Sequence, residues 1–128
     1  DEIIMLRNLD IPDERADLKI TLEHWLFCFY AGFYYNDLKR LTWDDVKNSD
    51  LGYYIMGNRY KNGRDYLSPI HKFQHAVEII NRRKGIHPTL IFPDAISEQK
   101  YNDKLKELIG LTNIKKNLMN KTARHSFI

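Results

Sequence analysis

Only one cysteine, Cys28, occurs among the 128 residues of the chain, so no disulfide can form within it. This cysteine lies in the apolar run 25–30, where a thiol packs as a small hydrophobic side chain. Long apolar runs are also missing. No run approaches the roughly 18 residues that cross a bilayer, and the chain does not open with the pattern of a signal peptide. We therefore expect a cytoplasmic protein without a membrane partner.

An excess of charge of one sign is lacking too. The chain has 20 Lys and Arg against 17 Asp and Glu, a formal net charge of +3 at pH 7, which does not by itself indicate nucleic-acid binding. No repeat or long linker divides the sequence, and its 43% hydrophobic content can supply one core. His71 and His75 are spaced for one helix face, but no third ligand lies near them in the sequence. We expect one domain over residues 1–128, with no metal and no cofactor.

Helical periodicity dominates the first third of the sequence. Apolar residues recur at steps of three and four from Asp13 to about Tyr30, which predicts a helix packed against the core. A second, short helix is expected over residues 37–41. Thr42 suits the N-cap of the turn that follows.

Two strand-like runs come next, at residues 53–56 and 66–67. Between them, Asn62-Gly63 is the strongest short hairpin signal in the sequence, because both residues tolerate the left-handed backbone of a tight turn. The pattern predicts one small antiparallel hairpin set between helices, in a domain that is mainly α.

The second half of the sequence returns to helical patterns. A serine and a proline at residues 68–69 predict the start of a helix that ends near Gly85. Residues 90–93 are apolar and indicate a buried connection. Ser97 is expected to cap a further helix that Gly110 closes. A last helical segment is expected near the end of the sequence.

Four segments of the sequence form a recognisable set. Residues 29–46 include Ala-Gly-Phe-Tyr-Tyr-Asn-Asp-Leu and then Leu-Thr-Trp-Asp-Asp, and Lys61 precedes the Asn-Gly turn. Residues 67–69 are Leu-Ser-Pro, and residues 121–127 are Lys-Thr-Ala-Arg-His-Ser-Phe. In this order and spacing they resemble the catalytic domain of tyrosine recombinases, the phage integrase family. The resemblance runs from about residue 13 to the end of the chain and is closest to integrases of conjugative transposons.

The resemblance implies a specific chemistry. In the family, a tyrosine attacks a DNA phosphodiester to give a 3′-phosphotyrosine, and a free 5′-hydroxyl from a partner strand reverses the step. Two arginines bind the phosphate where negative charge grows, a hairpin lysine protonates the leaving oxygen, and histidines assist. Arg124 matches the second arginine, Lys61 the lysine and His125 the histidine beside that arginine.

This sequence departs from the family pattern at three points. Tyr34 stands where the first arginine is expected, Lys121 replaces a histidine, and the chain ends before the nucleophilic tyrosine. We therefore expect a partial catalytic domain that binds DNA without cutting it. Arg59 lies two positions before Lys61, and strand side chains alternate between faces, so both leave the same face of the hairpin. We hypothesise that Arg59 supplies the missing contact.

Other cations are expected to contact the phosphate backbone of double-stranded DNA, which would give affinity without base recognition. These are Arg40, Arg64, Arg82, Arg83 and Lys84. Full-length relatives act as tetramers on DNA. A fragment that lacks the C-terminal segment exchanged between subunits is expected to be a monomer.

Two alternative functions stay open. One is a non-catalytic DNA-binding remnant of an integrase, in which Tyr34 reflects a loss of activity. The other is a helical protein-interaction domain with no DNA role. Within the domain, we expect Tyr34 to be a packing or hydrogen-bonding aromatic. Asp37 is expected to be a structural partner of nearby cations, its alternative being an ordinary exposed helix acid.

Overall fold

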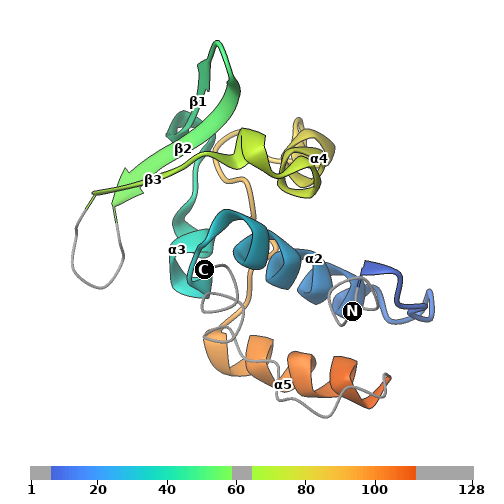
Figure 1. The fold of residues 1–128 in the computed structure, drawn as a ribbon. Helices are drawn as coiled ribbons and strands as arrows, with labels where there is room; N and C mark the ends of the chain where they lie inside the picture. The colour runs from blue at the N-terminus through green and yellow to red at the C-terminus, as the bar shows by residue number, and fades with distance from the viewer. Residues whose placement is uncertain (1–6, 59–64, 112–128) are drawn as a thin grey trace.

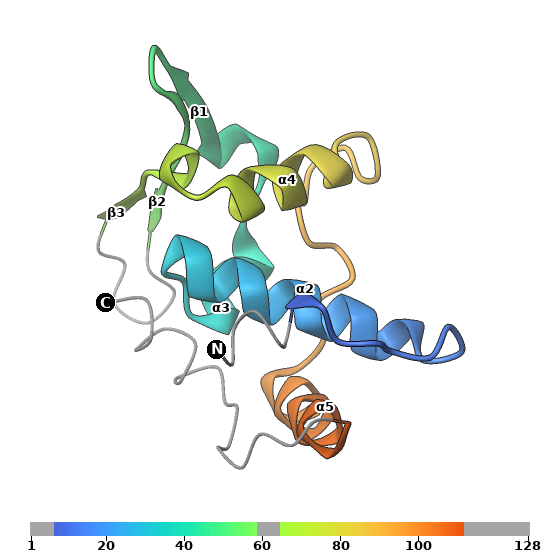
Figure 2. The ribbon, with the colours of Figure 1, turned by 45° about the vertical axis from the view of Figure 1, so that its right-hand side comes forward.

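The structure is a computed structural model that describes residues 7–58 and 65–111 (Figure 1). These residues form four α-helices and one small antiparallel sheet, which confirms the expected mainly helical class with a small β element. Helix α2 lies between α4 on one side and α5 on the other, and both views show this arrangement (Figures 1 and 2). None of the described helices is both long and apolar enough to cross a membrane.

Helix α2 (Ala16–Ala31) forms the centre of the core. It is buried on more than one face, since Leu18, Trp25, Phe27 and Cys28 are all at most 1% exposed. A helix that is apolar on most sides is stable only when other elements cover it. The helix begins three residues later than Asp13, because the backbone N–H of Arg15 turns back to the carbonyl of residue 12.

The end of α2 leads directly into α3 (Tyr35–Arg40). Gly32 ends α2 in the left-handed conformation, with φ at 79°, which glycine adopts without steric cost. The ring of Tyr35 then stacks on Tyr101 of α5 with centroids 3.8 Å apart, and burial raises the pKa of Tyr35 to about 12. This stack joins α3 to α5 through the core.

The predicted cap at Thr42 is confirmed. The Thr42 backbone N–H and hydroxyl both donate to the carboxylate of Asp45, at 3.0 and 3.2 Å, across the short 3₁₀ turn η1 (Trp43–Asp45). The side chain of Thr42 in turn accepts the backbone N–H of Asp45, and this reciprocal arrangement is a capping box. It fixes the direction in which the chain enters the sheet.

The sheet has three strands in the order β1 (Val46–Ser49), β2 (Gly52–Asn58) and β3 (Asp65–Ser68), all antiparallel. The predicted hairpin is the β2–β3 pair, with Ile55 opposite Ser68 and Asn58 opposite Asp65. Strand β1 was not predicted. It has only four residues, three of them exposed, so it carries no alternation of apolar and polar residues.

The helix start predicted at residues 68–69 is wrong. Ser68 ends β3, and its hydroxyl donates to the carbonyl of Ala31 at 2.7 Å instead of capping a helix. Pro69 has a ψ of 73°, outside the helical range, and a 3₁₀ turn η2 (Ile70–Lys72) comes before α4 (Gln74–Arg83). The serine therefore ties β3 to the end of α2.

The apolar segment 90–93, predicted to be a buried connection, lies between α4 and α5 (Glu98–Gly110) and is buried at its centre. Ile91 and Phe92 are each 1% exposed, and Leu90 forms an isolated bridge with Thr42. The hydroxyl of Ser97 accepts the backbone N–H of Lys100, which confirms the predicted cap of α5. Helix α5 turns Tyr101, Leu105 and Leu108 toward the core.

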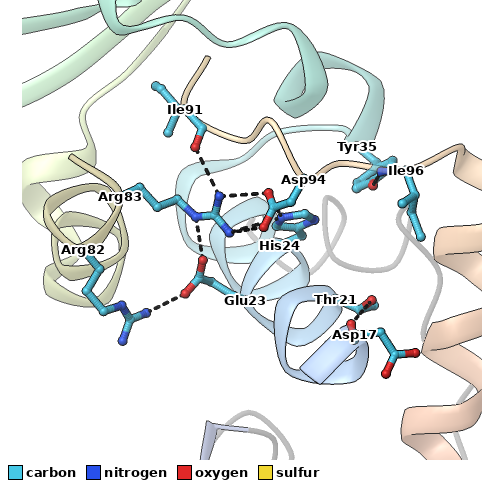
Figure 3. Close-up of polar contacts among 10 residues, drawn as sticks. All are labelled: Asp17, Thr21, Glu23, His24, Tyr35, Arg82, Arg83, Ile91, Asp94 and Ile96. Atoms are coloured by element: carbon cyan, nitrogen blue, oxygen red, sulfur yellow. Dashed lines mark hydrogen bonds and ion pairs between the residues drawn. The ribbon is translucent and has the colours of Figure 1, made fainter. Parts of the chain in front are cut away.

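A buried arginine joins three of these elements. The guanidinium of Arg83 donates to Glu23 of α2 at 2.6 Å, to both carboxylate oxygens of Asp94 at 2.9 and 3.0 Å, and to the carbonyl of Ile91 (Figure 3). It also lies 4.5 Å from the ring centroid of Phe92. Because its side chain is only 7% exposed, these acceptors replace nearly all of its hydration. We call Arg83, Glu23 and Asp94 the arginine clasp.

Replacing Arg83 with Met is expected to lower the free energy of unfolding by about 3 kcal/mol, the scale for removing one partner of a buried ion pair. The matched control is Arg82→Met. Arg82 also pairs with Glu23, but its side chain is 62% exposed, so its loss should cost less than about 1 kcal/mol. Urea unfolding followed by circular dichroism measures both. Equal losses in the two variants would contradict a structural role specific to Arg83.

Candidate nucleic-acid interface

One end of the sheet brings the first two recombinase-like segments together. Asn58 and Asp65 are register partners, so residues 59–64 connect two adjacent strand ends. Arg59, Lys61 and Arg64 are part of this connection and lie outside the described residues. The described strands fix only the two points from which the connection leaves the sheet.

The first recombinase-like segment, residues 29–46, contacts β3. The ring of Phe33, which is fully buried, packs edge-on against Tyr66 with centroids 5.0 Å apart. Tyr34 follows as the N-cap of α3 and is 40% exposed. The position at which the resemblance places an arginine therefore holds an exposed aromatic residue, whose backbone carbonyl accepts the N–H groups of Asp37 and Leu38.

A pocket of about 260 Å³ lies between α3, η1 and these strands. Its wall includes two carboxylates, an arginine and a tyrosine, namely Asp37, Asp45, Arg40 and Tyr66. Gly57 also lines it, and a Cβ there would lie 3.0 Å from the Tyr66 hydroxyl oxygen. Glycine thus lets the tyrosine cross over the neighbouring strand. Arg40, predicted to contact DNA, lies at this end of the sheet and is exposed to solvent.

Asp37 is buried, with 4% of its surface exposed. Asp37 is therefore not an ordinary exposed helix acid, and its burial agrees with the expected structural role of its carboxylate. Burial raises the pKa of the Cys28 thiol well above its usual range, and the negative charge of Asp37 adds to that effect. Cys28 is therefore held as a neutral thiol, which excludes it as a nucleophile at neutral pH.

The cationic run 82–84 lies elsewhere. Arg83 is in the arginine clasp, so the expectation that it contacts DNA is corrected: its guanidinium is buried and bound to acids of the same chain. Arg82 is exposed and pairs with Glu23 at 3.1 Å. The amino group of Lys84 lies 4.8 Å from the ring centroid of Tyr53 and contacts its hydroxyl.

Tyr53 lies at the opposite end of β2 from the connection 59–64. Asn58 is five positions further along the strand, which corresponds to about 17 Å of extended backbone. The residues predicted to contact the DNA phosphate backbone therefore do not all lie at the same end of the sheet. Arg40 lies near the end of the sheet that bears Lys61, and Lys84 is held near the other end.

The remaining predicted catalytic residues are Lys121, Arg124 and His125, and all three lie outside the described residues. His71 and His75, whose spacing had suggested a shared helix face, belong to η2 and α4 respectively. Nδ1 of His71 donates to the carbonyl of Tyr53, and the ring of His75 stacks on Tyr30. Among residues 7–58 and 65–111, no three His, Cys, Asp or Glu residues gather as a metal site.

Two histidines that no sequence pattern had singled out make specific contacts in the structure. Nε2 of His24, 1% exposed, lies 3.2 Å from Asp94 of the arginine clasp. Nδ1 of His87 accepts the backbone N–H groups of Thr89 and Leu90. Each partner is either 70 residues away or a backbone group, so no local sequence pattern could have identified them.

None of the family models, curated proteins or solved structures compared with this chain matches it.

The arginine clasp predicts a specific response to acid. Partial burial raises the pKa of Asp94, but hydrogen bonds from His24 and Arg83 outweigh it and hold the pKa well below the usual range. An unfolded aspartate titrates near pH 3.9, so ionised Asp94 contributes its full stabilisation of the fold above about pH 4. This stabilisation is lost as the pH falls through the pKa of Asp94 in the folded protein. Wild type should be more stable than Asp94→Asn at about pH 7, and the difference should shrink at about pH 3. Urea unfolding at both values measures it, and a difference that stayed constant would contradict this account.

Proposed function

We propose that this chain is the DNA-binding part of a tyrosine-recombinase-type catalytic domain, which in a longer protein cuts and rejoins DNA through a 3′-phosphotyrosine. The observation that carries the proposal is the pairing of β2 with β3 beside the start of α3. It brings the strand ends that flank residues 59–64 next to Phe33, in the first recombinase-like segment, residues 29–46. The two ends of the connection 59–64 therefore leave the sheet on the side of Phe33, and this supports a shared phosphate site there.

In this proposal the roles follow the resemblance residue by residue. Lys61 protonates the leaving 5′-oxygen, while Arg124 and His125 stabilise the charge on the non-bridging oxygens. Lys121 adds a cation where the family has a histidine. Arg59 takes the part of the first arginine, whose position is occupied by Tyr34.

The distribution of charge supports placing DNA on the α3 side of the sheet. Between the start of α2 and helix α5, two cations are paired with acids of the same chain. Lys104 pairs with Asp17 at 2.6 Å, and Arg15 pairs with both Asp17 and Glu107 at 3.1 Å. Such pairs leave little net positive potential to attract a phosphate backbone. Arg40 is exposed and lines the pocket beside β2 and β3. Among the described residues, it is the one that we most expect to contact the DNA phosphate backbone.

The DNA-binding prediction is tested by fluorescence anisotropy with a labelled duplex over a series of salt concentrations. Each neutralised phosphate contributes about 0.9 to the slope of log affinity against log salt concentration. Arg40→Gln should weaken binding and reduce the slope by about one, whereas Arg82→Gln, on α4 and away from the proposed interface, should leave the slope unchanged. If the wild-type chain did not bind duplex DNA even at low salt, the helical protein-interaction alternative would replace the proposal.

The catalytic prediction needs a chain that continues past Ile128 to a tyrosine. On a suicide DNA substrate, Lys61→Ala, Arg124→Ala and Arg59→Ala should each lower cleavage by about 10²–10³-fold, the usual effect of removing one group that stabilises transition-state charge. Arg82→Ala is the control and should cleave normally. Normal cleavage by Arg59→Ala would remove that residue from the site and leave the rest of the proposal intact.

A non-catalytic DNA-binding remnant is the second candidate, and the observation that favours it is Tyr34. An exposed tyrosine at the N-cap of α3 provides no cation where the family has its first arginine. The two candidates differ in the coding sequence beyond Ile128. A segment resembling the family's Gly-His and tyrosine region supports the enzyme, and a natural stop codon supports the remnant.

A further inference from the structure

A lysine and a tyrosine meet at the end of the sheet that lies away from the connection 59–64. Lys84, the C-cap residue of α4, donates a hydrogen bond from its ammonium group to the hydroxyl of Tyr53 on β2. The same ammonium group lies 4.8 Å from the centroid of the tyrosine ring. The ring and the hydroxyl therefore hold the end of a flexible side chain in one position.

The positive charge of Lys84 is not neutralised within the described part of the chain. Its two predecessors on α4 differ from it, because Arg83 is bound in the arginine clasp and Arg82 is directed to Glu23 of α2 (Figure 3). Lys84 is exposed, and no carboxylate of the described residues pairs with it. An exposed cation of this kind is available to an anion of another molecule.

The Tyr53 hydroxyl provides a second hydrogen-bond donor. It accepts the hydrogen bond from Lys84, and its own hydrogen has no acceptor among the described residues. Nδ1 of His71 donates to the Tyr53 carbonyl at 3.1 Å, which fixes the backbone from which the phenol extends. Tyr53 lines a pocket of about 290 Å³ together with Asn48, its register partner on β1. An ammonium group and a phenol hydroxyl that meet beside open space can both donate to one phosphate group.

We infer that Tyr53 and Lys84 together bind one phosphate of the DNA backbone. This inference rests on the proposed function, and it extends the DNA interface from the α3 side of the sheet to the other end of β2. Tyr53 had been assigned only to a strand from the sequence, and its contact with Lys84 is what gives it a place in the interface.

The spacing along β2 fits a single duplex. Tyr53 and Gly57 lie on the same face of the strand, because each is two positions from the buried Ile55. Gly57 lines the pocket that also holds Arg40, and about 13 Å of extended strand separates it from Tyr53. Each DNA strand carries one phosphate per ~3.4 Å of helix axis, so this spacing corresponds to about four base pairs. One duplex can therefore contact Arg40 and Lys84 together.

Fluorescence anisotropy with a labelled duplex, measured over a series of salt concentrations, tests the shared contact. Tyr53→Phe keeps the ring and removes only the hydroxyl, so it should weaken binding by about tenfold and leave the salt slope unchanged. Lys84→Gln removes a charge, so it should weaken binding and also reduce the slope by about one. Because both groups bind the same phosphate, the loss of affinity in the double variant should be smaller than the product of the two single losses.

Tyr54→Phe and Lys106→Gln are the matched controls. Tyr54 is the next residue of β2 and lies on the opposite face of the strand from Tyr53. Lys106 is an exposed lysine of α5. Both control variants should bind the duplex as the wild type does.

The same measurements separate this inference from the proposed function. If Arg40→Gln weakened binding while Tyr53→Phe and Lys84→Gln bound normally, the inference would be overturned and the proposed function would stand. An effect in only one of the two variants would also overturn it, because a shared phosphate needs both donors. A wild-type chain that did not bind duplex DNA would overturn both proposals.

Discussion

Placing an arginine inside a small domain costs free energy unless acceptors of the same chain replace the water around its guanidinium. Here the acceptors come from α2 and from the connection between α4 and α5, so that one side chain of α4 determines where both must lie. Phe92 covers the guanidinium, and His24 approaches the same carboxylate of Asp94. Arg83 thus holds the middle of the connection, at residues 91 and 94, between the Leu90–Thr42 bridge and the start of α5.

Local chemistry was sufficient to predict much of this fold. Apolar periodicity located α2, the hairpin signal located β2 and β3, and short-range caps at Thr42 and Ser97 marked where elements begin. Each of these patterns involves residues close together in the chain, so a short stretch of sequence is enough to predict the element. Ser68 shows the limit of this reasoning. Its hydroxyl could have capped a helix, but it donates a hydrogen bond to the carbonyl of Ala31, 37 residues earlier, instead.

The candidate site shows the same contrast. Three adjacent cations at residues 82–84 are indistinguishable in sequence, yet one is buried, one is exposed and paired, and one rests on an aromatic ring. What separates them is the position of Glu23, Asp94 and Tyr53, which lie 11 to 60 residues away. The residues proposed to act on the phosphate lie outside the described residues. For them the sequence resemblance is the argument, and the described strands supply the point of attachment.

Strand β1 lies at an edge of the three-stranded sheet, where one side of its backbone is not paired with another described strand. Edges of this kind can recruit strands from other molecules and start aggregation, especially when they are long, flat and apolar. β1 is only four residues long, and its sequence Val-Lys-Asn-Ser places an exposed lysine in the middle of the edge. The polar composition that hid this strand from sequence-based prediction therefore also disfavours its pairing with a strand of another molecule.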